Sequence, residues 1–359
     1  MTVPVGADGA LGLYSAVADA FAGRRLGFGR RRAALAARFA RARGAGDAAT
    51  AVWVAGALGD VGLIEVVTAA DALARVRARV AADVPLHGAR IVASLAGVPA
   101  EAADLVRWHR EHDDGTGIPD GLRWDAIPPN AAAIGIVDAF LAERDEGAEP
   151  RDAFEALLAL GAEAGRRFSV EIVRAFRAFV TAEPDVDAPF VPELPPIDDA
   201  AALAMLAERI DARDERTRGA SSRLAARAAT LAERLGLDAP RAARAARLLA
   251  LGRAAESVAT DAFDPLSRFA REQRTALAER ASAIAGSVAA FANDAPALAG
   301  SAAWYEDGEV DPYAALLAVI VAADSLDPAD TPQRLAAAAG SQLHPDVTRA
   351  YISALGAPR

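Results

Sequence analysis

The sequence contains no cysteine and no lysine, and arginine supplies all 39 of its basic residues. Without cysteine the chain forms no disulfide, no thiolate metal site and no cysteine nucleophile, which suits a reducing compartment. Histidine is nearly as scarce, because a chain of 359 residues holds only four: His87, His109, His112 and His344. So few histidines limit the number of histidine-ligated metal sites that the protein can build. The alanine-rich, lysine-free composition suggests a bacterium with a GC-rich genome.

Long hydrophobic runs are also lacking. The best apolar run, residues 314–323, is too short to span a bilayer as a helix. The opening residues, MTVPVGADGALG, lack the basic segment and apolar core of a signal peptide. A net charge of −10 argues against broad binding to a nucleic acid polymer, because such binding depends on neutralising phosphates. We therefore expect a cytoplasmic protein that binds neither membranes nor nucleic acid polymers.

What the sequence does contain is a strong helical period. In SRLAARAATLAERLGL the apolar residues Leu224, Ala228, Leu231 and Leu235 are spaced by four, three and four, which places them on one helical face. Alanine, the best helix former, fills many of the remaining positions. Strand-like alternation is scarce, so the sequence predicts an all-α fold.

Proline marks the main break in this helical pattern. Residues 182–199, AEPDVDAPFVPELPPIDD, hold five prolines, which remove backbone donors and hold the chain extended. The chain is also longer than one hydrophobic core usually needs. We therefore predict a first domain at 1–181, a proline-rich linker at 182–199 and a second domain at 200–359.

The two halves share sequence markers in the same order. Residues 164–176, AGRRFSVEIVRAF, and residues 339–351, AGSQLHPDVTRAY, place glycine, apolar and aromatic residues in step. The Asp-Gly pair at 114–115 recurs at 307–308. These markers predict an internal duplication. The two related bundles are expected to pack as an internal pseudo-dimer, with a homodimer as the alternative.

One stretch carries a family resemblance. HREHDDGTGIPDGLRWDAIPPNAAAIGIVDAF, residues 109–140, resembles the HD-GYP family of bacterial metal-dependent phosphohydrolases. LGDVG at 58–62 and AGSQLHPDV at 339–347 are similar to two further family motifs. The resemblance implies two tandem HD-GYP-like helical bundles. It also implies metal ions that activate a water, with cyclic di-GMP or a related cyclic dinucleotide as the substrate.

The positions of the family's metal ligands mostly hold residues that cannot bind metal. In the first half the resemblance aligns the tandem histidines with His109 and Arg110, and the last aspartate with Asp138. The family's His-Asp pair aligns with Gly56 and Ala57, and its middle histidine aligns with Val84. The lysine of the His-Asp motif, which is not a ligand, aligns with Asp60. In the second half the ligand positions hold Leu249, Ala250, Leu277, Ala302, Ala303 and a matching Asp324. The resemblance thus predicts no metal, no cofactor and no catalytic residue, with His109, Asp138 and Asp324 as vestiges of ligands.

A different metal site is the alternative. His109, His112 and Asp113 have the i, i+3, i+4 spacing that places side chains on one helical face, and Asp138 would complete the set. The simpler interpretation is a solvated helix end that Gly115 stops.

A basic stretch, RRLGFGRRR at 24–32, is a candidate for phosphate binding. Arginine binds phosphate through two parallel hydrogen bonds, and the glycines would let a ligand approach the backbone. The predicted ligand-binding residues are Arg24, Arg25, Arg30, Arg31, Arg32 and Arg110. A solvated basic helix start is the alternative.

These observations favour a catalytically inactive tandem HD-GYP-like protein that regulates or scaffolds, and that binds a cyclic dinucleotide or a signalling partner. The alternative is a working metal-dependent cyclic dinucleotide phosphodiesterase with relocated ligands, which would need a divalent metal. A purely structural interaction module is a third class that the sequence does not separate from the first.

Overall fold

The computed structural model describes residues 9–66, 81–145, 151–183, 185–194, 196–254, 264 and 266–355, and most of the residues behind the signal-peptide expectation lie outside them. The chain divides into two compact units, Met1–Asp198 and Asp199–Arg359. Within the described residues every regular element is a helix, and β-contacts are isolated bridges such as Asp114 with Arg123. The predicted all-α class is confirmed.

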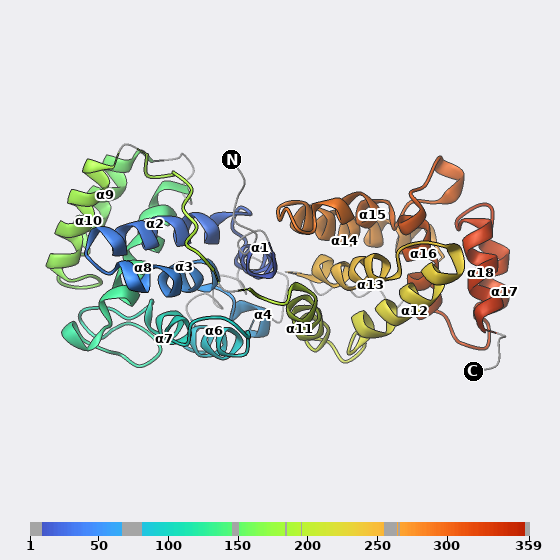
Figure 1. Ribbon diagram of the computed structural model, residues 1–359, viewed down its shortest axis with the longest axis horizontal. Helices are drawn as coiled ribbons and strands as arrows, with labels where there is room; N and C mark the ends of the chain where they lie inside the picture. The colour runs from blue at the N-terminus through green and yellow to red at the C-terminus, as the bar shows by residue number, and fades with distance from the viewer. Residues whose placement is uncertain are drawn as a thin grey trace. The chain divides into compact units, whose positions relative to one another are not determined.

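Unit 1 is a bundle of helices around an apolar core (Figure 1). Its elements are α1 (Ala10–Ala22), α2 (Phe28–Ala42), η1 (Gly46–Ala48), α3 (Ala49–Leu58), α4 (Leu63–Val66), α6 (Asp83–Ala93), α7 (Glu101–Trp108), η2 (Trp124–Ala126), α8 (Pro129–Asp145), α9 (Ala153–Ala162) and α10 (Val170–Ala182). Polar side chains cap the N-terminal ends of α9 and α10. Asp152 and Glu155 form a capping box at α9, and Ser169 accepts a hydrogen bond from the backbone N–H of Ile172 at α10.

Three phenylalanine rings join α2, α8 and α10 in the core of unit 1. Phe176 of α10 is fully buried, and its ring meets those of Phe39 and Phe140 edge to face at centroid distances of 5.1 and 5.3 Å. Edge-to-face pairs add about 0.5–1.5 kcal/mol beyond the burial of apolar area. The three rings therefore hold α2 and α8, which carry residues of the site described below, against α10.

The proline-rich segment packs along unit 1. The indole Nε1 of Trp53, in α3, donates to the carbonyl oxygen of Phe190 at 2.8 Å. Arg38 Nη2 of α2 donates to the carbonyl oxygen of Asp185 at 2.8 Å. The extended backbone of this segment is thus satisfied by side chains of the bundle, and residues 185–194, predicted as a linker, form part of the surface of unit 1.

Unit 2 repeats the helical character. Its elements are α11 (Asp199–Asp211), α12 (Ala220–Leu235), α13 (Ala239–Leu248), η3 (Leu249–Arg253), α14 (Arg268–Gly286), η4 (Ala292–Asp294), α15 (Ala295–Gly300), η5 (Tyr305–Asp307), α16 (Pro312–Asp324), α17 (Thr331–Ala338) and α18 (Pro345–Leu355). The face predicted from sequence lies on α12. Leu224, Ala228 and Leu231 are buried there, while Leu235 is half-buried.

The turn between the first two helices has the same design in both units. In unit 1 the carboxylate of Asp19, at the end of α1, accepts from the backbone N–H groups of Gly27 and Gly29 at 2.8 and 3.0 Å. In unit 2 the carboxylate of Asp211, at the end of α11, accepts from the N–H of Ser221 at 2.7 Å. Each aspartate therefore supplies an acceptor to the start of the following helix.

A second local geometry recurs before the last helix of each unit. Gly165 has φ 77° and its N–H donates to the carbonyl oxygen of Phe168 at 2.7 Å, while Gly340 has φ 87° and donates to that of Leu343 at 2.9 Å. Glycine adopts such a left-handed conformation without steric cost. Both turns fall in the sequence repeat at 164–176 and 339–351. These recurrences support the internal duplication, which stays a prediction.

One segment, Gly46–Val66, is long and apolar enough by composition to cross a membrane. Of its most apolar window, 83% is buried inside unit 1, and it contains α3, which packs against α2. The apolar run at 314–323 lies in α16, where most residues are buried. Both runs are core helices of their units.

Phe176→Ala tests the aromatic core. Removing a fully buried ring leaves a cavity beside Phe39 and Phe140, and such truncations cost about 3–5 kcal/mol in the free energy of unfolding. Phe154, which is 67% exposed on α9, provides the matched control, and Phe154→Ala should change that free energy by less than about 0.5 kcal/mol. Urea unfolding of both variants makes the comparison. Equal costs would contradict the assignment of this core.

Candidate functional site

A buried carboxylate organises the interior of unit 1. Asp60 follows α3, and its side chain is 2% exposed. Arg32 Nη1 of α2 donates to Asp60 Oδ2 at 2.9 Å, and Arg24 Nη1 lies 3.4 Å from the same oxygen. Arg110 Nη2, just after α7, donates to Asp60 Oδ1. A single buried carboxylate is thus surrounded by three guanidinium groups, which offset the large cost of removing its charge from water.

Asp138 of α8 is the second carboxylate of this group. Arg24 Nη1 donates to Asp138 Oδ1 at 2.8 Å, and Arg32 Nη1 donates to the same oxygen. Burial alone would raise the pKa of Asp138, but the charges of Arg24 and Arg32 hold it far below its usual value. Burial likewise opposes ionisation of Asp60, and Arg32, Arg24 and Arg110 hold its pKa well below the usual range. We call Asp60, Asp138, Arg24, Arg32 and Arg110 the arginine–aspartate cluster.

Small residues admit the guanidinium of Arg32 to the cluster. Arg32 Nε donates to the carbonyl oxygen of Gly56 at 2.7 Å. A Cβ on Gly56 would lie 2.7 Å from Cα of Ala33, so the close approach of α2 and α3 requires glycine there. A Cβ on Gly59 would lie 2.9 Å from Arg32 Nη2 and 3.2 Å from His109 Nε2. Glycine at position 59 therefore leaves space for the guanidinium of Arg32, and glycine at position 56 lets α2 approach α3.

His109 borders the cluster as a neutral imidazole. It caps the end of α7, is 4% exposed, and its Nδ1 lies 2.8 Å from the carbonyl oxygen of Val106. That contact assigns the proton to Nδ1, and Nε2 has no hydrogen-bond partner among the described residues. Burial, together with the charges of Arg110 and Arg32, lowers the pKa of His109 to about 4. His109 and Asp138 both lie near the guanidinium of Arg32, whose charge lowers the pKa of each.

The loop after α7 does not build the alternative metal site. Because α7 ends at Trp108, His112 and Asp113 do not continue a helix from His109, so the expected shared helical face is wrong. His112 Nδ1 instead contacts the hydroxyl of Thr116 at 3.1 Å. Over the described part of the chain no group of three or more His, Cys, Asp or Glu side chains is placed to hold a metal ion.

Glu111 shapes the glycine-rich loop from inside. Its buried carboxylate accepts from the backbone N–H groups of Asp120 and Leu122 at 2.7 and 2.9 Å. A Cβ on Gly117 would lie 2.2 Å from the backbone nitrogen of His112, so the loop closes tightly only with glycine. This internal support explains the conformation of the loop without a bound metal.

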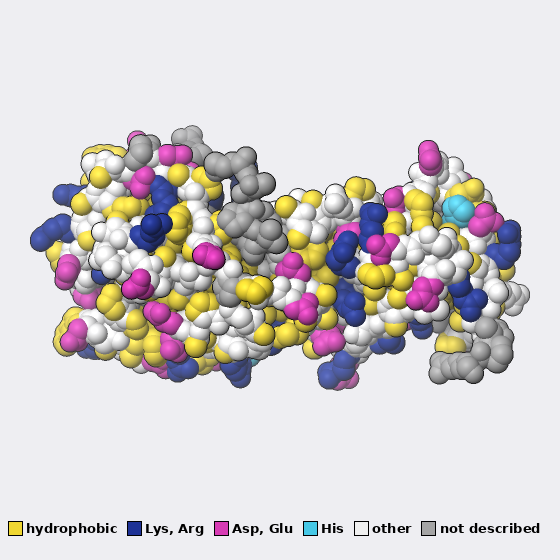
Figure 2. All heavy atoms as spheres, viewed as in Figure 1, with side chains coloured by type: hydrophobic (Ala, Val, Ile, Leu, Met, Phe, Trp, Pro, Cys, Tyr) yellow, Lys and Arg dark blue, Asp and Glu magenta, His cyan; other side chains and the backbone are white. Residues whose placement is uncertain are grey.

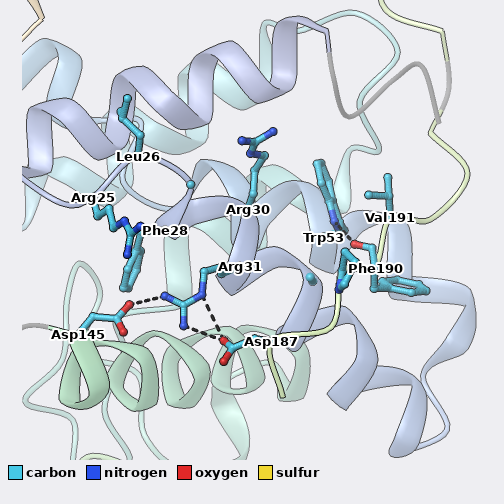
Figure 3. A pocket seen from close by; sticks show the side chains of 13 residues that line it. Arg25, Leu26, Phe28, Arg30, Arg31, Trp53, Asp145, Asp187, Phe190 and Val191 are labelled. Atoms are coloured by element: carbon cyan, nitrogen blue, oxygen red, sulfur yellow. Dashed lines mark hydrogen bonds and ion pairs between the residues drawn. The ribbon is translucent and has the colours of Figure 1, made fainter. Parts of the chain in front are cut away.

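The six predicted ligand-binding arginines separate into two groups. Figure 2 shows basic and acidic side chains intermixed on the visible surface of each unit. Arg24, Arg32 and Arg110 belong to the buried cluster, so a ligand would have to break their ion pairs to reach them. The others line a cavity of about 730 Å³ in unit 1 (Figure 3), namely Arg25, Arg30 and Arg31.

In unit 2, Asp324 is also bound by arginine. Arg227 Nη1 donates to Asp324 Oδ1 at 2.7 Å and Arg223 Nη2 to Oδ2 at 3.3 Å. Both arginines come from α12, and Asp324 ends α16. His344 accepts a hydrogen bond through Nδ1 from the N–H of Asp346 at 3.3 Å, at the start of α18.

Comparison with known proteins relates unit 1 to a known family. A family model described as HD domain matches residues 18–172, which include both aspartates of the cluster. Residues 18–172 form an HD domain. This confirms the resemblance at the level of the HD-domain family.

The fold of the chain is also similar to that of a solved structure. It is similar to the crystal structure of a cyclic GMP-AMP specific phosphodiesterase from V. cholerae, with a TM-score of 0.68 and 16% sequence identity. The similarity covers 98% of each chain. The sequence of this chain matches no curated protein sequence.

The residues present in the HD domain do not fit a divalent metal cluster. The aligned positions Gly56, Ala57 and Val84 carry no donor atoms in their side chains. Asp60 and Asp138 do carry donors, but guanidinium groups already occupy them. An added cation would face several fixed positive charges, each repelling it by several kcal/mol at about 4 Å and an effective dielectric constant near 20. His109 Nε2 is then the one uncommitted donor among the aligned positions.

Sequence reasoning missed the central role of Asp60. The alignment treated it as the replacement of a lysine and gave it no partner. Its setting in AVWVAGALGDVGLI, a stretch otherwise without charge, is the signal that could have found it, because a lone charge in an apolar segment is buried only with partners.

Asp60→Asn tests the cluster. Removing one partner of a buried ion pair leaves uncompensated charge, here on Arg32 and Arg110, and costs about 3–5 kcal/mol in the free energy of unfolding. Asp120 pairs with Arg107 at the surface, so Asp120→Asn should cost at most about 1 kcal/mol. Urea unfolding at pH 7 measures both. A cost below 1 kcal/mol for Asp60→Asn would refute an energetically important cluster.

His109 should make stability depend on pH. Burial and the nearby arginines depress its folded-state pKa to about 4, while histidine in the unfolded chain titrates near 6.5. Its contribution to stability is therefore present above pH 6.5 and is lost as the pH falls toward 4. We expect wild type to lose about 2 kcal/mol more than His109→Gln between pH 7 and pH 5.

Urea unfolding of both proteins at both pH values measures this difference. Asp19 acts in the opposite direction, because burial raises its pKa to about 7 and its contribution is lost as the pH rises from about 4 to 7. That contribution is common to both proteins and cancels. Parallel pH profiles for wild type and His109→Gln would contradict a neutral, buried His109.

Proposed function

We propose that this HD-domain protein does not hydrolyse cyclic dinucleotides and instead regulates or scaffolds, binding a cyclic dinucleotide or a signalling partner. The observation that carries the proposal is the occupation of Asp60 and Asp138 by Arg24, Arg32 and Arg110. In the HD-GYP resemblance, the position aligned with Asp138 belongs to a metal ligand. Here the carboxylates have arginine as their counter-charge.

The chemistry of hydrolysis supports this interpretation. Activating a water at neutral pH needs a cation held by about three protein ligands with one open position. Around the cluster, His109 Nε2 is a single donor without a second histidine beside it, since Arg110 stands there. Loss of a supporting group alone costs roughly 10- to 100-fold in metal affinity or activity, so loss of most direct ligands has a larger effect.

A metal-dependent cyclic dinucleotide phosphodiesterase with relocated ligands is the second candidate. It is favoured by the fold shared with the V. cholerae protein, which is described as a cyclic GMP-AMP specific phosphodiesterase. The two candidates make opposite statements about metal and turnover. Together with the first candidate, we propose that the two units arose by tandem duplication and that the protein is cytoplasmic.

Metal analysis and a hydrolysis assay separate the candidates. We expect purified protein to hold less than one metal per chain, and to leave cyclic di-GMP and cyclic GMP-AMP intact when manganese, iron or nickel is added. Elemental analysis and chromatography of the nucleotides measure the two quantities. His87, which pairs with Glu65 away from the cluster, supplies the matched control variant His87→Ala.

Stoichiometric metal with turnover that His109→Ala abolishes and His87→Ala retains would establish the second candidate. Turnover retained in both variants would also reject the proposed loss of hydrolysis, and would place the reaction away from His109.

A further inference from the structure

The composition of α9 is unusual for a helix at the surface of a bundle. Its sequence, AFEALLALGA, carries a single charged side chain, that of Glu155, which the capping box uses. Ala156 and Leu160 are buried against the bundle. Phe154 and Leu158 are 67% and 60% exposed, and α9 lies at the edge of unit 1 beside α10 (Figure 1). A helix that is apolar on every side is ordinarily covered on every side.

The exposed residues of α9 share one helical face. Phe154, Leu158 and Gly161 have the i, i+4, i+7 spacing of a single stripe, on the side opposite the buried Ala156 and Leu160. All three are exposed. Two neighbouring large apolar side chains are thus left in contact with water, and covering them with a partner surface is favourable. We call Phe154, Leu158 and Gly161 the α9 face.

Gly161 gives this face a hollow. The residue lies within the helix and does not have the left-handed conformation that favours glycine. A Cβ built on Gly161 would meet no described atom within 4 Å, so packing within unit 1 does not require glycine there. Glycine is also a poorer helix former than alanine. The α9 face therefore has a large ring at its start, Phe154, and a gap in its side chains near its end.

The helix at the same place in unit 2 has a polar outer side. α17 precedes the turn at Gly340 as α9 precedes the turn at Gly165. Its outer side carries an exposed Gln333 and the side chain of Arg334, which pairs with Asp264. A helix at this place can therefore carry polar side chains toward water. The apolar face is a property of α9 itself and not of the fold.

We propose that the α9 face binds a second copy of this chain, with the two α9 helices antiparallel about a two-fold axis. In such a pair the ring of Phe154 lies over Gly161 of the partner subunit, and the two Leu158 side chains meet near the axis. The face is complementary to itself, because the two-fold rotation brings the ring of each chain to the gap of the other. An unrelated partner would cover the ring but would not need the gap.

The charges at the ends of α9 favour the same direction. Asp152 and Glu155 lie at its start, and the exposed Arg166 follows its end. Antiparallel packing brings the start of one helix against the end of the other. Arg166 pairs with Glu163 within its own chain, and its further donors can reach the carboxylates of the second copy. The two helix dipoles also oppose one another in this arrangement.

The size of the face determines the strength of the dimer. α9 has ten residues and is therefore about 15 Å long. Stable dimers bury about 800 Å² on each partner, and one short helix covers less than that. We therefore expect a weak, reversible dimer with a dissociation constant of about 10 μM to 1 mM. The chain is then a monomer in dilute solution, where Phe154→Ala leaves its unfolding nearly unchanged.

Sedimentation equilibrium of the full chain tests the dimer. Between about 5 μM and 1 mM the average mass should rise from 37.0 kDa toward twice that value. Leu158→Ala should weaken the association at least about tenfold, because it removes an apolar contact at the centre of the interface. Leu355→Ala truncates an exposed leucine of unit 2 and is the matched control, which should leave the association unchanged.

A paired exchange locates the contact. Phe154→Ala removes the ring and Gly161→Leu fills the gap, and each alone should weaken the association at least about tenfold. Gly161→Leu meets nothing in the described part of its own chain and adds a better helix former, so this variant should unfold at no lower temperature than wild type. In the double variant the added side chain fits the space that the ring has left. Its association should return to within about threefold of wild type.

A mass of one chain up to about 1 mM would overturn the proposal. Equal weakening by Leu158→Ala and Leu355→Ala would overturn it as well. Additive losses in the double variant would also overturn it, because they would place the contact elsewhere. Thermal unfolding establishes that each variant remains folded. None of these results bears on hydrolysis, so the dimer and the proposed function are tested separately.

Discussion

The buried charge of Asp60 is the constraint on which the interior of unit 1 depends. A carboxylate that is 2% exposed is stable only if charged partners reach it, and here they come from three places in the chain. Arg24 precedes α2, Arg32 lies within it, and Arg110 follows α7. Asp138 brings in α8, so one ionic cluster joins α2, α3, α7 and α8.

The cluster also suggests how an HD domain can keep its shape without metal ligands. In a metal-binding arrangement, cations offset the charges of buried carboxylates. Here guanidinium groups supply the positive charge, and Gly59 leaves the room that the guanidinium of Arg32 needs. Arginine remains charged at any physiological pH, so this compensation is permanent. A metal would have to compete with three covalently tethered cations, which is why the charge pattern rather than the fold carries the proposed loss of hydrolysis.

Much of the fold could be predicted from sequence, and much of the site could not. The period of Leu224, Ala228 and Leu231 predicted a buried helical face because side-chain spacing determines which residues share a face. The basic stretch at 24–32 was ambiguous for a geometric reason. Spacing along a turn does not determine the direction of each side chain, and here Arg24 pairs with Asp138 in the interior while its neighbour Arg25 lines the cavity. The prediction that His112 and Asp113 share a helical face with His109 was wrong, because the sequence does not show that α7 ends at Trp108.

Unit 2 also pairs an aligned aspartate with arginine, and the exposure of its arginines can be compared with that in unit 1. Asp324, the one aligned carboxylate there, is again bound by two arginines, but they are 48% and 37% exposed. A pair so open to water contributes little to stability, so its loss would cost unit 2 less than loss of the buried cluster would cost unit 1. Arginine therefore accompanies the aligned aspartate in both units. The two aspartates are equally exposed, at 17%, but the arginines that bind Asp138 are buried whereas those that bind Asp324 are open to water. If the proposed function holds, arginine takes the place of a bound cation at this aspartate in both units.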